Sequence, residues 1–163
     1  MRTVKVIAQE VAGNFVHDLT PLLRTPARVV CPTDEAEQAV VDAVTQAATD
    51  HGIPVEVVDL RPAPAERLDA VTARLDGWGG APTDDASPAP TVLILRGFDV
   101  FGDEASDGPT YPFRSNFQFD HKFLWLFIGR DAARMRFLFG SYRRPLYRAA
   151  GDITPEDWRP AKP

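Results

Sequence analysis

The sequence predicts an α/β domain, a three-layer sandwich around a mostly parallel sheet, and two patterns support this class. Four short stretches rich in β-branched and other apolar residues have the composition of buried strands, and the last two are nearly continuous apolar runs, as central parallel strands are. They cover residues 27–31, 55–60, 91–95 and 123–128. An amphipathic helical segment separates the first two, and such a strand–helix–strand connection joins parallel strands.

The N-terminal segment, residues 1–26, is predicted to be helical. Apolar residues recur there at spacings of three and four, which is the pattern of one buried helix face: Val4, Ile7, Val11, Phe15 and Leu19. Pro21 is expected to begin a separate short helix over residues 21–24, because proline is tolerated at the first helical position.

The helix between the first two strands has the strongest local pattern. Asp34 and Glu37 stand three residues apart, the spacing of a capping box, and predict its start, while Gly52 predicts its end. A core-facing stripe follows the start: Val40, Val41, Val44, Ala47 and Ala48.

The later part of the chain is predicted to complete the same domain. A helix is expected over residues 64–76, with Leu68, Val71 and Leu75 on one face. Residues 77–90 are rich in Gly, Pro, Ala and Asp and are expected to form a flexible loop, and residues 101–120 a turn-rich region with at most a short helix. Residues 141–163 form a Pro-rich tail that is expected to wrap the surface. Because the strands on either side of the 77–90 loop need one another as neighbours, residues 1–163 are predicted to be a single domain.

Composition excludes several classes of protein. The longest apolar run has six residues, against about 20 for a membrane-spanning helix, and the N-terminus has no apolar signal region. One cysteine and three histidines exclude a disulfide framework and do not favour a zinc cluster. A net charge of −5 disfavours nucleic acid as a partner. A cytoplasmic protein with no metal and no membrane contact is expected.

The charge is unevenly distributed along the chain. Residues 1–120 contain 9 basic and 19 acidic residues, whereas residues 121–150 contain 7 basic residues and 1 acidic residue. Arginine mixed with aromatic residues is typical of protein-binding surfaces, and it also occurs on single-stranded nucleic-acid platforms. Internal charge balance against the acidic part is the competing interpretation. The candidate partner-binding residues are Arg130, Arg134, Arg136, Tyr142, Arg143, Arg144 and Arg148.

Ligands of parallel α/β sheets bind at the carboxyl ends of the strands, and residues 31–38 lie where a phosphate-binding loop would. The stretch RVVCPTDEAEQAVVDAVTQAATDHGIPVEVVDL resembles the first βαβ unit of an AAA-type P-loop ATPase. VLILRGFDVF is similar to the family's acidic magnesium-binding motif, and FLWLFIGRD to its sensor strand. The resemblance covers about residues 19–131 and implies a P-loop NTPase-like fold.

The residues that serve nucleotide chemistry in that family are replaced. On the phosphate loop, Cys31 and Pro32 take the places of the first glycine and the proline, Glu37 that of the lysine, and Gln38 that of the magnesium-binding hydroxyl residue. Arg96 and Gly97 stand at the acidic pair, and Arg130 falls near the polar residue of the sensor strand.

These replacements predict that nucleotide does not bind. A phosphate loop needs glycines for backbone approach, a lysine and a hydroxyl, but this loop contains no glycine and carries Asp34, Glu35 and Glu37. The carboxylates themselves satisfy the helix dipole. The sequence therefore predicts a non-catalytic pseudo-ATPase-like domain without cofactor, which binds protein as an interaction or regulatory subunit of a larger complex; that complex could include an active ATPase.

Two alternatives remain open at this stage. The pattern strand–Cys-Pro–helix also resembles the start of a thioredoxin, which would make Cys31 a single redox cysteine; Asp34 replaces the second cysteine, and the neighbouring carboxylates raise the pKa of a thiol. The acidic composition also fits a small inhibitor of a basic enzyme, as in barstar-like immunity proteins.

Overall fold

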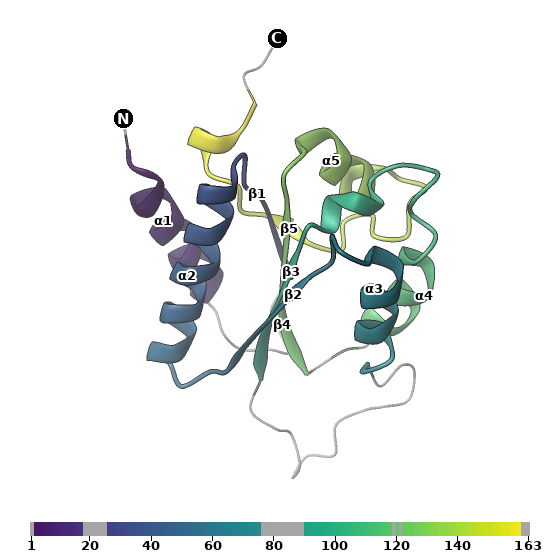
Figure 1. The fold of residues 1–163 in the computed structure, drawn as a ribbon, viewed down its shortest axis with the longest axis horizontal. Coiled ribbons are helices and arrows are strands. Elements are labelled where there is room, and N and C mark those ends of the chain that lie inside the picture. The colour runs from purple at the N-terminus through teal and green to yellow at the C-terminus, as the bar shows by residue number, and fades with distance from the viewer. Residues whose placement is uncertain (1, 18–25, 76–89, 119, 121, 161–163) are drawn as a thin grey trace.

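The computed structural model describes residues 2–17, 26–75, 90–118, 120 and 122–160. Five parallel strands form one sheet in the order β2-β3-β4-β1-β5, with helices on both faces (Figure 1). The strands are β1 Ala27–Val30, β2 Val55–Asp59, β3 Thr91–Arg96, β4 Phe123–Gly129 and β5 Gly151–Asp152. The α/β class and the three layers predicted from the sequence are confirmed.

The helices divide between the two faces of the sheet. On one face lie α1 Val4–Val16 and α2 Asp34–Asp50. On the other lie α3 Pro64–Thr72, α4 Thr110–Phe117, α5 Ala132–Gly140 and the short 3₁₀ helix η2 Phe98–Phe101. The central strands bury side chains on both faces: Ile94 and Leu126 pack against α1 and α2, whereas Leu95 and Phe127 pack against the other layer. This two-sided burial is why the central strands are continuous apolar runs.

The connections between strands follow from the handedness rule. The chain passes from β1 to the far edge at β2, and then returns through β3 and β4 to β5. Parallel crossovers are right-handed, so the reversal of direction places α2 on one face and α3, α4 and α5 on the other. The connections that leave β1 and β4 therefore diverge to opposite faces, and the carboxyl ends of these neighbouring strands occupy the position at which such sheets have their ligand-binding crevice; we refer to this position as the crevice.

The predicted elements agree with the structure to within a few residues, with two omissions among the α-helices and strands of the described residues. Helix α5 was not expected, although Met135, Leu138 and Phe139 are buried at helical spacing. The two-residue strand β5, which pairs with β1, was not expected either. The predicted helix over residues 21–24 and nearly all of the 77–90 loop lie outside the described residues.

The predicted capping box at the start of α2 is wrong. Thr33 is the N-cap, and its Oγ1 accepts a hydrogen bond from the N–H of Ala36 at 3.1 Å. Thr33 can do this because its own backbone is extended, as an N-cap requires. Asp34 is therefore the first residue of the helix, and Glu37 lies one turn after the N-cap. The carboxylates of both residues are available for other partners.

The C-terminal segment is part of the core, not only a surface tail. It forms β5 and the 3₁₀ helix η3 Glu156–Trp158, and Trp158 packs with residues of α1 and α2. In the parts of the chain that the structure describes, no helix is long and apolar enough to cross a membrane.

Replacing Trp158 tests this packing. Trp158→Ala is expected to lower the free energy of unfolding by about 3 kcal/mol, because a large buried side chain leaves a cavity. Tyr142→Ala removes an aromatic ring that is 81% exposed and is expected to cost under about 0.5 kcal/mol. Urea denaturation of both variants provides the comparison, and equal losses would contradict the buried position of Trp158.

Candidate functional site

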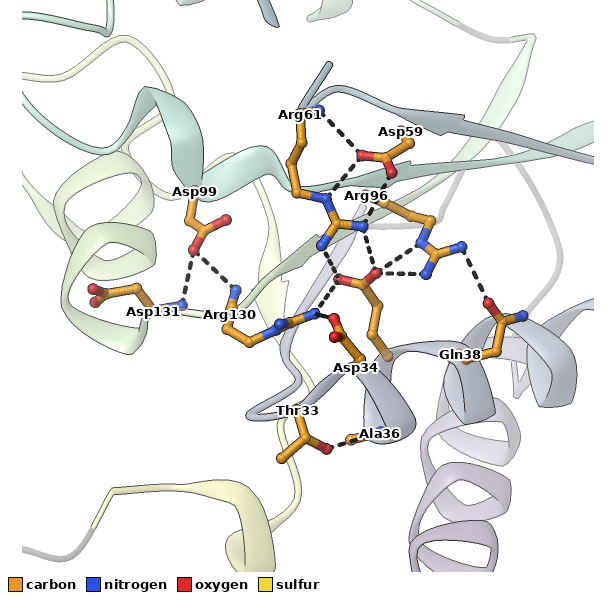
Figure 2. Close-up of polar contacts among 11 residues, drawn as sticks. Thr33, Asp34, Ala36, Gln38, Asp59, Arg61, Arg96, Asp99, Arg130 and Asp131 are labelled. Atoms are coloured by element: carbon orange, nitrogen blue, oxygen red, sulfur yellow. Dashed lines mark hydrogen bonds and ion pairs between the residues drawn. The ribbon is translucent and has the colours of Figure 1, made fainter. Parts of the chain in front are cut away.

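The crevice at the strand ends is occupied by charged side chains of the protein itself. Residues from four connections meet there: the start of α2 after β1, Arg61 after β2, Arg96 at the end of β3 and Arg130 after β4 (Figure 2). The crevice is the position at which parallel α/β sheets bind their ligands.

Glu37 is the centre of this arrangement. Its side chain is 1% exposed and receives hydrogen bonds from three guanidinium groups. Arg96 donates from Nε and Nη2 to Oε2 at 2.9 and 2.6 Å, and Arg61 donates from Nη2 to Oε2 at 2.8 Å and from Nη1 to Oε1 at 3.3 Å. Arg130 Nη2 lies 3.4 Å from Oε1. The carboxylate is thus buried with its charge compensated from three sides.

Two more carboxylates complete the ion pairs of these arginines. Asp34 Oδ1 lies 2.6 Å from Arg130 Nη2, and Asp59 Oδ1 lies 2.9 Å from Arg61 Nε. The Arg61 guanidinium lowers the pKa of the Asp59 carboxyl below its usual value. We call the six residues Asp34, Glu37, Asp59, Arg61, Arg96 and Arg130 the Glu37 cluster; three positive charges face three negative charges.

Neighbouring residues hold the cluster in place. Asp99 Oδ2 accepts the backbone N–H groups of Arg130 and Asp131 at 3.0 and 2.9 Å, which fixes the end of β4. Gly97 has a φ of 73°, and a Cβ there would lie 2.5 Å from Cγ of Arg61. Glycine is therefore needed both for the left-handed backbone and for the passage of the Arg61 side chain. Gln38 Oε1 accepts from Arg96 at 3.3 Å.

Sequence reasoning located part of this cluster. Asp34, Glu37, Arg96 and Arg130 were identified by their positions at the carboxyl ends of predicted strands, and the structure brings them together. Asp59 and Arg61 were missed, although Asp59 lies near the carboxyl end of the predicted strand 55–60 and Arg61 directly follows that strand. That position was the available signal.

Cys31 lies beneath the crevice and is fully buried. Its N–H donates to the carbonyl of Gly129 at 2.9 Å, which extends the pairing of β1 with β4, and Pro32 follows it at the surface. Burial, with a smaller contribution from the charge of Glu37, raises the pKa of the thiol to about 12. These surroundings keep the thiol protonated and away from solvent, so they do not favour a reactive cysteine.

The predicted partner-binding arginines fall into two groups. Arg130 belongs to the Glu37 cluster, Arg134 pairs with Asp103 at 2.5 Å, and Arg144 pairs with Asp107 at 2.8 Å and Glu104 at 3.0 Å. These three arginines balance internal carboxylates. The remaining four predicted residues are exposed: Arg136, Tyr142, Arg143 and Arg148.

Comparison with known proteins adds information on the fold alone. The chain matches no protein-family model, and no similar sequence is found among curated proteins. Among solved structures it is similar to the crystal structure of Rif2 in complex with the C-terminal domain of Rap1, with 8% sequence identity and a TM-score of 0.50. The match covers 93% of this chain, which spans 58% of the length of that one. At this identity the similarity shows a shared fold.

Neutralising Glu37 tests the cluster. Glu37→Gln keeps the shape of the side chain but leaves three guanidinium groups facing an uncharged amide, and the free energy of unfolding is expected to fall by about 3 kcal/mol. Glu35→Gln is the matched control, because Glu35 is exposed in the same helical turn and should change stability by no more than about 0.5 kcal/mol. Chemical denaturation at neutral pH measures both, and similar values for the two variants would contradict the central role of Glu37.

The buried thiol makes a separate prediction. Because the pKa of Cys31 is raised to about 12, the thiol is protonated throughout the neutral range, and iodoacetamide should not modify the native protein between about pH 6 and pH 9. The same reagent should modify Cys31 rapidly in urea at the upper end of that range. Native labelling that titrates with a pKa below about 7 would contradict this and favour the redox alternative.

Proposed function

We propose that this chain is a non-catalytic domain, related to AAA-type P-loop ATPases, which acts by binding another protein. The observation that carries the proposal is the Glu37 cluster. It fills with internal ion pairs the crevice in which an ATPase of that type would hold the phosphates of its nucleotide.

The charge pattern of the crevice supports the absence of nucleotide chemistry. The start of α2 already carries the Asp34 carboxylate, and the buried Glu37 carboxylate takes up hydrogen-bond donors that phosphate oxygens would otherwise use. Arg96 stands where an acidic residue would be needed for magnesium, and a guanidinium does not bind a cation. A nucleotide would have to displace ion pairs and then meet carboxylates, which opposes binding.

The positions of the three segments that carry the resemblance support the relationship to AAA-type domains. These segments contain β1, β3 and β4, which are neighbours in the sheet, so their carboxyl ends meet at one place. Here β4, which contains the sensor-like FLWLFIG, lies between β1 and β3.

A protein partner is the remaining part of the proposal. The exposed arginines and Tyr142 provide side chains typical of protein-binding surfaces. The structure of Rif2, similar in fold, contains Rif2 in complex with a domain of Rap1, so a fold of this kind serves protein binding in at least one other protein. We propose a regulatory or interaction subunit of a larger complex, with an active ATPase as one candidate partner. The acidic-inhibitor alternative stays a hypothesis, and the burial of Cys31 gives the redox alternative no support.

Thermal unfolding with nucleotide tests the proposal. Millimolar ATP or ADP with magnesium should leave the melting temperature unchanged, whereas a ligand at 100 times its Kd would stabilise the protein by about 2.7 kcal/mol. Glu37→Ala is a sensitivity control: inorganic phosphate should raise its melting temperature more than that of the wild type, because the three arginines then lack a carboxylate. A magnesium-dependent shift of the wild type would overturn the proposal.

Affinity purification tests the protein-binding part. The tagged chain should retain an ATPase-containing complex. Retention of a basic enzyme only at low salt would instead favour the inhibitor alternative.

A further inference from the structure

A cleft lies at the edge of the sheet, and no residue of the Glu37 cluster is among those that line it. It consists of two hollows of about 290 and 480 Å³ on either side of Arg28, between α5 and the segment that contains β5. Arg136, Asp152 and Arg159 line the first hollow together with Arg28, and Tyr147 and Arg148 line the second. We call these six residues the edge cleft.

The edge cleft carries an excess of positive charge. It contains four arginines and one carboxylate, that of Asp152, which lies 3.5 Å from Arg159. Among the described residues, neither Arg28 nor Arg136 has a carboxylate within ion-pair distance. The positive charge of this cleft is thus not balanced internally, in contrast to that of Arg130, Arg134 and Arg144.

Arg28 is the central residue of the cleft. It is half-buried, donates from Nη1 to the carbonyl of Ala150 at 2.9 Å, and lies over the ring of Phe139 at 5.3 Å from the ring centre. Burial lowers the pKa of its guanidinium. The charge of Asp152 acts in the opposite sense, although its carboxylate forms no ion pair with Arg28. A partly desolvated guanidinium interacts more strongly with an arriving anion than an exposed one does.

The backbone at Arg148 is strained. Its φ of 58° lies in the left-handed region, and its N–H donates to the carbonyl of Phe139 at 2.8 Å. The guanidinium lies over the ring of Tyr147, 5.1 Å from its centre. Residues other than glycine that adopt a strained backbone conformation are concentrated at functional sites. Arg148 is such a residue, and it lines the cleft.

The sheet edge beside the cleft is open. β5 has β1 as its one neighbour in the sheet, and the N–H groups of Gly151 and Ile153 donate toward the β1 side, to the carbonyls of Pro26 and Arg28. Because backbone groups alternate along a strand, those of Asp152 face outward. An extended chain could therefore lie along β5 with its side chains directed at both hollows.

We propose that the edge cleft binds an acidic, extended segment of a protein partner. Guanidinium groups pair with carboxylates through two parallel hydrogen bonds, and two hollows separated by Arg28 suit carboxylates spaced along a peptide. A long nucleic-acid strand is opposed by the net charge of −5 of the whole chain. This inference rests on the proposed protein-binding function and names the chemistry of the partner.

Fluorescence anisotropy with a labelled peptide of about ten alternating Glu and Gly residues tests the proposal. The wild-type protein is expected to bind it at low salt. Arg136→Glu and Arg148→Gly are each expected to weaken binding by about tenfold. Arg148→Gly also relieves the left-handed strain, so unfolding of the variant does not explain a loss.

Lys5→Glu is the matched control, because it makes the same change of charge as Arg136→Glu on an exposed residue of α1 outside the cleft lining, and it should weaken binding by less than about threefold. Equal losses for these two variants would overturn the proposal, as would tighter binding of oligothymidylate than of the peptide. Absence of peptide binding by the wild type would also overturn it. The predicted absence of an ATP-dependent shift in melting temperature does not depend on the edge cleft. Failure of the peptide experiment would therefore leave the prediction for the crevice unchanged.

Discussion

The burial of one carboxylate governs the strand ends of this protein. A charge in the interior costs several kcal/mol unless it is paired, and Glu37 is 1% exposed. Its compensation requires arginines from three connections, and the path of one of them, Arg61, in turn requires glycine at position 97. The same contacts join α2 to the end of β3 and to the residues that follow β2 and β4.

The uneven charge of the sequence has two structural explanations rather than one. Part of the basic segment serves internal pairing: Arg134 and Arg144 neutralise the acidic loop that contains Asp103, Glu104 and Asp107. The other part faces solvent, and Arg136 and Arg148 line the cleft beside β5. Internal charge balance therefore accounts for some of these arginines, and three-dimensional contacts are needed to show which arginines it leaves unpaired.

The main elements could be predicted because their patterns depend on burial alone. β3 and β4 are buried on both faces, and α2 on one, so their apolar periodicity is strong. Helix α5 was missed because it is short and because Met135, Phe137 and Phe139 also alternate as in a strand, and β5 was missed because two residues that begin with glycine carry no strand pattern. Asp34 took the place of Thr33 in the expected cap because both residue types favour that position. The convergence on Glu37 depends on strand order, which one sequence does not encode locally.

The strand order also has a consequence for how the chain folds. β1 forms no pair with β2 or β3; its partners are β4 and β5, with Ala27 aligned to Leu126 and to Gly151. During synthesis, β1 and α2 must wait until about a hundred further residues have emerged before the centre of the sheet can close. Contacts this distant in sequence slow folding. Until then the early part of the chain exposes an apolar face, and this is the stage of folding at which a chaperone would have the most apolar surface to protect.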